Sequence, residues 1–319
     1  MFSFLARRFF QGFLVILLVV IGTFLLEHFV PGGPAVVALG RRATPENIKI
    51  YNIQNGLNRP MVLQLLSYLN QAIHLNLGYS LIQHAPVWYL IKSALGHTVM
   101  LITVALIIQF ALAVPLGNMQ AQRRNSHFDY VATSVTFVLY ATPVFLIGEF
   151  LISIFAIKIH LFPVTVNPAG GAYAIFTSPV QYVLPVLTLS LLGVGGLSRY
   201  QRSSMLDTLT QDYIRTAKAK GLPHKKVINR HAIRNSILPM ITIVGLSLPS
   251  IVGGALITET IFDIPGMGLL TLRSATNYDM PVVVGTTIVA AAVTVIGSIV
   301  ADILYAIADP RIRLGSGGR

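Results

Sequence analysis

Six apolar runs alternate with polar segments along this chain of 319 residues. Most of them approach the roughly 20 residues that an α-helix needs to cross a bilayer. The fourth run is the shortest and the most interrupted, and the six lie at about 9–28, 98–117, 131–157, 182–197, 237–258 and 282–308. The pattern predicts an all-α integral membrane protein with about six transmembrane helices. Pro115, Pro143 and Pro185 fall inside these runs, where proline can kink a helix.

The polar segments between the runs are unequal in length. The longest, residues 30–96, holds two apolar-periodic stretches at 62–73 and 87–94, separated by Gly78 and Pro86. This spacing predicts a small, mostly helical cap. The chain is therefore divided into a first span with its N-terminus (1–29), the cap (30–96), a membrane core (97–308) and a tail (309–319).

Composition and charge agree with a membrane protein and predict its orientation. Hydrophobic residues make up 54% of the chain and charged residues 11%, with a mean hydropathy of +0.71, whereas soluble domains carry about 25% charged residues. If the N-terminus is cytoplasmic, 16 of the 23 Lys and Arg residues lie on the cytoplasmic side. The positive-inside rule therefore predicts cytoplasmic termini, an extracytoplasmic cap and a multi-pass location in the plasma or inner membrane. The net charge of +12 follows from this orientation, and no nucleic-acid partner is expected.

The densest charge lies in residues 212–239, DYIRTAKAKGLPHKKVINRHAIRNSILP, between the fourth and fifth runs. Asp212 is suited to cap a short helix that reaches Lys220, and Gly221 is suited to end it. Pro223 is suited to the first turn of a second helix. We expect a helix–glycine–helix elbow in water, shaped to bind a soluble partner. A basic loop that only satisfies the positive-inside rule is the simpler alternative.

Several motifs in order resemble one family of transport proteins. Arg215, Thr216 and Ala217, followed by Gly221 and then by Leu238 and Pro239, are similar to the EAA loop of ABC-importer permeases. The loop departs from that pattern at its first two positions, where Arg and Thr replace Glu and Ala. Its Arg-Thr-Ala form resembles the peptide/nickel branch. Further segments that resemble this branch are FVPGGPA at 29–35, GLNRP at 56–60, LGYS at 77–80, ETIF at 259–262, PGMG at 265–268 and DPR at 309–311.

The resemblance covers nearly the whole chain and implies a type I ABC-importer permease, most similar to the B-type subunit. It implies a heterodimer with a second permease, two cytoplasmic ATP-binding subunits that dock on an EAA-type coupling loop at 199–236, and an extracytoplasmic solute-binding protein. It also implies ATP-driven uptake of di- or oligopeptides by alternating access. Nickel chelates, glutathione and haem-like compounds are alternative cargoes, since related systems carry them.

The chain holds no sign of catalytic chemistry of its own. The phosphate-binding pattern G-x-x-x-x-G-K-[ST] is missing, so ATP hydrolysis is expected in partner subunits, and we expect no enzyme activity and no cofactor. The chain has no Cys, and its eight His residues show no metal-ligand spacing. Gly193, Gly195 and Gly196 lie inside an apolar run, where small residues favour close helix packing.

Three acidic residues in or near the apolar runs are candidates for function. Charged groups are costly inside a membrane and often mark a pathway. Glu149 lies well inside the third run and either lines the translocation path or pairs with a neighbouring helix, whereas Asp302 favours structural pairing. Glu259 lies near the outer end of its run, where it is expected to reach water. With Pro265 and Gly266 it is a candidate outer gate or receptor contact. A secondary transporter driven by an ion gradient is the leading rival function, but it would need a longer series of such acids.

Overall fold

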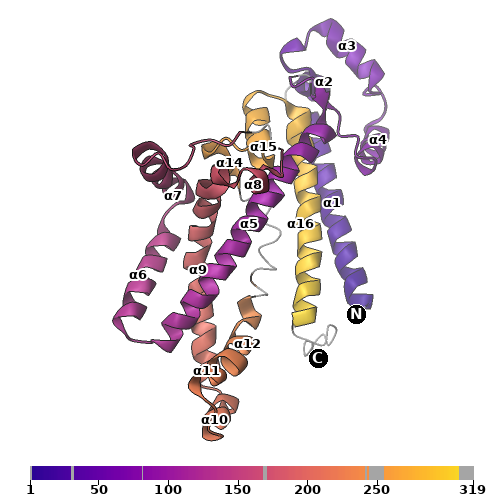
Figure 1. Ribbon diagram of the computed structural model, residues 1–319. Helices are drawn as coiled ribbons and strands as arrows, with labels where there is room; N and C mark the ends of the chain where they lie inside the picture. Colours follow the sequence, from indigo (N-terminus) through magenta and orange to yellow (C-terminus); the bar gives the residue numbers. More distant parts are fainter. Residues whose placement is uncertain are drawn as a thin grey trace.

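A computed structural model describes residues 2–29, 32–80, 82–167, 171–240, 243 and 255–308. These residues are almost entirely helical, and their one sheet is a short antiparallel pair, β1 (Tyr79–Ser80) with β2 (Ala85–Pro86). Figure 1 shows long, roughly aligned helices, with the cap (residues 33–86) at one end and the elbow (residues 212–236) at the other. The two ends are called the cap side and the elbow side below.

The N-terminal half holds α1 (Phe2–Phe29), the cap and the first core helices. The cap consists of α2 (Gly33–Leu39), η1 (Gly40–Arg42), α3 (Pro45–Gln54), α4 (Met61–Ile73) and the two strands. Thr44 caps α3 by accepting the Asn47 N–H at 3.3 Å, and Pro45 occupies the first helical position. The core continues with α5 (Val87–Gln122), α6 (His127–Ala141), α7 (Val144–Leu151), the π-helical η2 (Ile152–Lys158), α8 (Ala174–Thr177) and η4 (Pro179–Tyr182).

The C-terminal half begins with α9 (Val183–Leu209) and then forms the elbow. The elbow consists of α10 (Asp212–Ala219), α11 (His224–Lys226), the π-helical η5 (Val227–Ala232) and α12 (Ile233–Ser236). On the cap side, α14 (Leu256–Ile261) and α15 (Met267–Thr276) precede the long final helix α16 (Met280–Ala308).

The helix α5 packs along α9, and glycines bring the helices together. A Cβ added at Gly117 of α5 would lie 2.5 Å from the Ser198 carbonyl oxygen of α9. A Cβ at Gly195 would lie 2.7 Å from the Thr136 carbonyl oxygen of α6, and one at Gly193 would overlap the Gln109 side chain. The prediction that the glycines of this run allow close helix packing is confirmed.

The membrane spans differ from the apolar runs in several places. Four described helices are long and apolar enough to cross a membrane, namely Ala6–Leu26, Val87–Gln122, Pro179–Leu209 and Met280–Ile303. Residues 87–94, which we assigned to the cap, are instead the first turns of α5. The helix of the fourth run extends beyond the apolar residues, through the polar residues after 197, and ends at Leu209. Most of the fifth run, 237–258, lies outside the described residues.

The third run is a bent pair of helices rather than one straight span. The helix from His127 to Ala141 and the helix from Val144 to Lys158 are bent by 106°. Pro143 explains the break, because proline disfavours helical geometry at the residue before it, and Thr142 is extended with ψ 129°. The pair makes a fifth span if it is counted as one. Pro115, in contrast, lies inside the unbroken α5.

The first and last helices pair with each other and support the cap. The Arg8 guanidinium of α1 makes two contacts with the Asp302 carboxylate of α16, at 3.0 and 3.3 Å. The structural interpretation of Asp302 is thereby confirmed. At the cap side, the Ser80 hydroxyl of β1 donates a hydrogen bond to the Asp279 carboxylate, just before α16 begins. Burial raises the pKa of this Asp279 carboxyl, and the Ser80 hydroxyl opposes the rise.

Candidate functional site: the elbow and its anchoring

The elbow forms the far end of the molecule, beyond the end of α9 (Figure 1). Its first helix begins at Asp212 after the N-cap Gln211 and ends at Ala219. Asp212 is therefore a first-turn residue rather than the cap that we expected, and its carboxylate pairs with Arg215 at 3.4 Å. Pro223 is likewise the N-cap of α11 rather than a residue of its first turn. Each of these boundaries is offset by one residue from the prediction.

Gly221 ends α10 in the conformation that the sequence predicts. Its φ is +74°, in the left-handed region that glycine enters at little cost. The Gly221 N–H donates to the Lys218 carbonyl at 3.0 Å, and the Leu222 N–H donates to the Ala217 carbonyl at 3.4 Å. This pair of bonds defines a Schellman motif, which satisfies two carbonyls at the helix end and fixes the direction of the chain after it.

The elbow is packed against the membrane core by its own apolar side chains. Its buried cluster joins Ile214 and Ala217 of α10 with residues of η5 and with the elbow-side ends of α5 and α9; the members are Ala121, Met205, Ile214, Ala217, Val227, Ile228 and Ala232. Leu222, which follows the Schellman turn, packs on the same cluster. The elbow is thus one folded unit with the ends of α5 and α9, and it differs from a flexible basic loop.

The outer surface of the elbow is basic and exposed. Arg215 and Thr216 are exposed, whereas Ala217 faces the core. The other exposed cations are Lys218, Lys220, Lys225, Lys226, Arg230 and Arg234. Gly221 is also exposed, and an added Cβ would meet no atom within 4 Å. Leu238 and Pro239 lie just after α12, where Leu238 is half-buried and Pro239 exposed. The structure therefore places these six predicted residues at the elbow side of the molecule.

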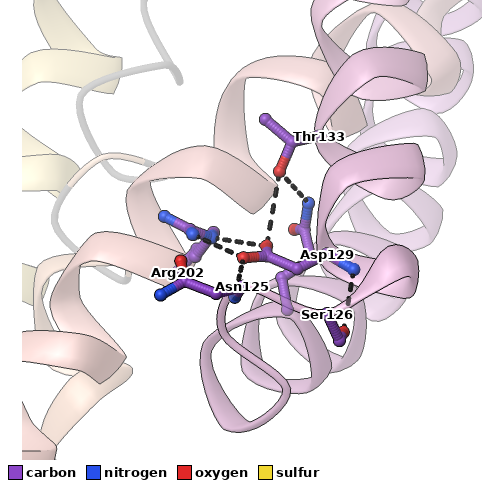
Figure 2. Close-up of polar contacts among 6 residues, drawn as sticks. Asn125, Ser126, Asp129, Thr133 and Arg202 are labelled. Atoms are coloured by element: carbon purple, nitrogen blue, oxygen red, sulfur yellow. Dashed lines mark hydrogen bonds and ion pairs between the residues drawn. The ribbon is translucent and has the colours of Figure 1, made fainter.

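An ion pair that the sequence analysis did not identify ties α6 to α9 beside the elbow. Figure 2 shows the Arg202 side chain reaching from α9 to the Asp129 carboxylate, with Nε–Oδ1 at 2.8 Å and Nη2–Oδ2 at 2.7 Å. Asp129 sits in the first turn of α6, whose N-terminal dipole favours a negative charge. Its Oδ2 also accepts the Asn125 N–H at 3.0 Å. Such a bidentate pair fixes both the distance and the orientation between α6 and α9.

A second polar group joins the elbow to both long helices. The buried Gln201 amide of α9 donates to Asn118 Oδ1 of α5 at 2.7 Å and to Ser236 Oγ of α12 at 3.0 Å. The Ser204 hydroxyl of α9 donates to the Ser236 carbonyl at 2.8 Å. Both Gln201 and Ser236 are fully buried. Because unpaired polar groups are costly inside protein, these bonds hold α12 to α5 and α9 in one arrangement.

On the cap side, Glu259 is a buried clamp. It has 0% exposure, so the expectation that its carboxylate reaches water is wrong. The carboxylate accepts the Thr98 hydroxyl of α5 at 2.6 Å and the Gly268 and Leu269 N–H groups of α15 at 2.8 and 3.1 Å. A partner cannot touch this side chain directly in this structure, and a role in an outer gate stays a prediction.

The two glycines of the PGMG segment make room for this carboxylate. A Cβ on Gly266 would overlap the Glu259 carboxyl group, and one on Gly268 would lie 3.0 Å from Glu259 Oε2. Gly266 is itself buried, whereas Pro265 beside it is half-buried. Glu259 and Gly266 therefore pack together inside the chain, next to Pro265.

Glu149 lies on the exposed side of α7. Among the residues that the structure describes, no side chain pairs with it, so the alternative of a structural partner within this chain has no support there. Its place on a path or against another chain remains a prediction. Within the same part of the chain, no three His, Cys, Asp or Glu side chains gather where a metal ion could be held.

Comparison with known proteins agrees with this geometry. Residues 113–314 match the family model of the binding-protein-dependent transport system inner membrane component, and residues 1–102 match the N-terminal model of the same system. The chain therefore belongs to the family of binding-protein-dependent transport system inner membrane components, which are multi-pass membrane permeases of ABC importers.

Three relatives are named for peptide transport. The chain is 36% identical over 314 residues to the oligopeptide transport system permease protein AppB of Bacillus subtilis (strain 168), covering 98% of this chain and 99% of that protein. It is 33% identical over 314 residues to the dipeptide transport system permease protein DppB of Escherichia coli (strain K12), covering 91% of this chain and 93% of that protein. A putative peptide transport system permease protein of Brucella abortus (strain 2308) is 33% identical over 317 residues, which is 98% of this chain and 99% of that protein.

Proposed function

We propose that this chain is a transmembrane permease subunit of an ATP-driven importer of di- and oligopeptides, and that it forms the translocation path with a second, homologous permease. Its relatives AppB and DppB are named as oligopeptide and dipeptide permeases and match it over nearly its full length. Peptides are therefore the first cargo to test, ahead of nickel chelates, glutathione and haem-like compounds.

The observation that carries the proposal is the built elbow. A soluble motor protein that moves a membrane helix needs a rigid handle, because a flexible loop would absorb the motion. The elbow is such a handle: its turn is fixed by a Schellman motif at Gly221, and its apolar face is buried on the ends of α5 and α9. Its basic outer face is left open for an ATP-binding subunit, one of two that the complete importer would hold.

The remaining partners follow from the two ends of the molecule. With the elbow in the cytoplasm, as the distribution of basic residues predicts, the cap faces outward. The cap and the segment 260–281, which contains α15, are then the surface on which an extracytoplasmic solute-binding protein delivers its cargo. Crosslinks from the binding protein to residues of this surface would support the placement, and crosslinks that map only to other chains would contradict it.

Reconstitution with the copurifying partner chains tests the function as a whole. We expect uptake of labelled dipeptides into vesicles to require ATP, the loaded binding protein and an intact ATPase, and to persist when a protonophore collapses the proton gradient. Uptake that follows an ion gradient without ATP would instead establish the secondary transporter. Mass spectrometry of the cargo in the copurified binding protein identifies the substrate, and a nickel chelate, glutathione or haem found there would replace peptides.

A further inference from the structure

The cap helix α4 exposes several apolar side chains. Its successive residues turn by about 100°, so Val62, Leu66, Leu69 and Ile73 share one face. Val62, Leu66 and Ile73 on this face are 69%, 57% and 78% exposed, whereas Leu69 at its edge is half-buried. In a helix surrounded by water, the apolar stripe normally faces the protein core. The exposed apolar side chains of α4 indicate that its outer surroundings are apolar.

The opposite face of α4 is polar; its Gln64 is half-buried, whereas Ser67 and Gln71 are exposed. Gln64, Ser67 and Gln71 line a cavity of about 740 Å³ between the cap, α1 and α16. Gln64 is fully engaged there: its amide donates to the Leu57 and Arg59 carbonyls at 2.9 and 2.7 Å, and its Oε1 bonds to His28 Nε2 at 2.8 Å. These bonds hold α4 in an orientation that leaves Val62, Leu66 and Ile73 exposed.

The height of α4 matches the edge of the membrane. Tyr68 of α4 stacks near Phe24 of α1, with ring centroids 5.5 Å apart, and its hydroxyl lies 3.4 Å from Thr23 Oγ1. Both Thr23 and Phe24 lie in the last turns of the apolar span Ala6–Leu26. Figure 1 shows α4 beside the cap-side end of α1, while α3 lies farther out. The apolar face of α4 is therefore level with the surface of the bilayer that α1 crosses.

We propose that α4 lies in the cap-side leaflet of the membrane, with the side chains of Val62, Leu66 and Ile73 among the acyl chains near the headgroups. The sequence of the helix, MVLQLLSYLNQAI, has no charged residue that would hold it in water or form ion pairs with a protein partner. At the cap-side end of α1, Leu26 and Phe29 are exposed as well. Amphipathic helices, with one apolar and one polar face, lie flat in the interface. The cap is thus a membrane-seated element rather than a domain held away from the bilayer by a linker.

Spin labels on single cysteines test the proposal directly, because the chain has no native Cys. Labels at Val62→Cys, Leu66→Cys and Ile73→Cys are compared with a label at Ile53→Cys, which replaces an exposed apolar residue of α3 on the far side of the cap. The full chain with its partner chains is placed in vesicles of phosphatidylethanolamine and phosphatidylglycerol. Collision of each label with oxygen, which concentrates in lipid, and with a water-soluble nickel chelate is then measured.

We expect a several-fold higher ratio of oxygen to nickel-chelate collisions at 62, 66 and 73 than at 53. Equal ratios at all four positions would show that α4 is in water and would overturn the proposal. Shielding of the three labels from both collision partners would also overturn it, because a protein surface would then cover the helix. Repeating the measurement with and without the solute-binding protein identifies that surface in the second case.

Discussion

Gly221 offers the sharpest test of the elbow, since its contribution can be separated into conformation and charge. Its φ of +74° is the reason for glycine, because an added Cβ meets nothing within 4 Å. Alanine therefore adds no clash inside this chain and only the cost of the left-handed conformation, about 1 kcal/mol. That cost corresponds to about a fivefold shift in the local equilibrium between the formed and the frayed turn.

Asparagine and aspartate at this position make a matched pair. Both have nearly the same shape, and both enter the left-handed region more readily than alanine. They differ in charge, and the neighbouring surface of the elbow is strongly basic. We expect Gly221→Ala to weaken transport, Gly221→Asn to keep more of it than Gly221→Asp, and Gly221→Asp to abolish it. The reason is that the aspartate charge would lie where the ATP-binding subunit seats.

The assay is stimulation of ATP hydrolysis by the loaded binding protein in reconstituted vesicles, with retention of the ATPase on the purified permease measured in parallel. Insertion of the chain into the membrane should stay near normal in all three variants, because no span depends on this exposed turn. Full ATP-driven uptake by Gly221→Asp, with the ATPase still bound, would refute the role of the elbow in coupling.

Four further predictions concern other sites. Arg202→Ala should destabilise the folded chain by about 3–5 kcal/mol, because it leaves the buried Asp129 carboxylate unpaired. The midpoint temperature of unfolding of this variant in detergent should rise when Asp129→Ala is added. Gly266→Ala should lower the yield of folded protein, since its methyl group overlaps the Glu259 carboxyl group. A size-exclusion profile equal to that of the unaltered chain would contradict this. Glu149→Gln should alter transport kinetics with assembly intact if the residue lines the path, so normal kinetics together with normal assembly would remove it from consideration. Lys218→Cys should react with an impermeant thiol reagent only in inverted vesicles, and labelling from outside intact cells would reverse the assigned topology.

Local features of the fold could be predicted from the sequence. The turn at Gly221 depends on residues within a few positions of it, so glycine after a helical stretch was enough to indicate it. The bend at Pro143 depends on the same kind of short-range sterics. The prediction nevertheless treated residues 131–157 as one span, because hydropathy measures how apolar a segment is and carries no information on its direction.

Features that depend on distant residues could not be predicted in this way. Asp129 and Arg202 lie 73 positions apart, and a charge at each end of a span looks like an ordinary loop residue until the helices are packed. Glu259 shows the opposite error. Its place near the end of an apolar run suggested water contact, whereas the turn between α14 and α15 folds back and buries the carboxylate. The nearby glycines at 266 and 268 were the available signal, because they mark a position with no room for side chains.

In the proposed importer, the unbroken helix α5 would act as a lever. Asn118 bonds to Gln201 beside the elbow, and Thr98 bonds to Glu259 at the opposite end. The 20 residues between them span about 30 Å, at about 1.5 Å per residue. With one end as a pivot, a tilt of about 10° moves the other end by about 5 Å, as the length of the helix dictates. Pro115 does not interrupt α5, so a small rotation imposed at one end would move the other end by more than the rise of three helical residues, about 4.5 Å.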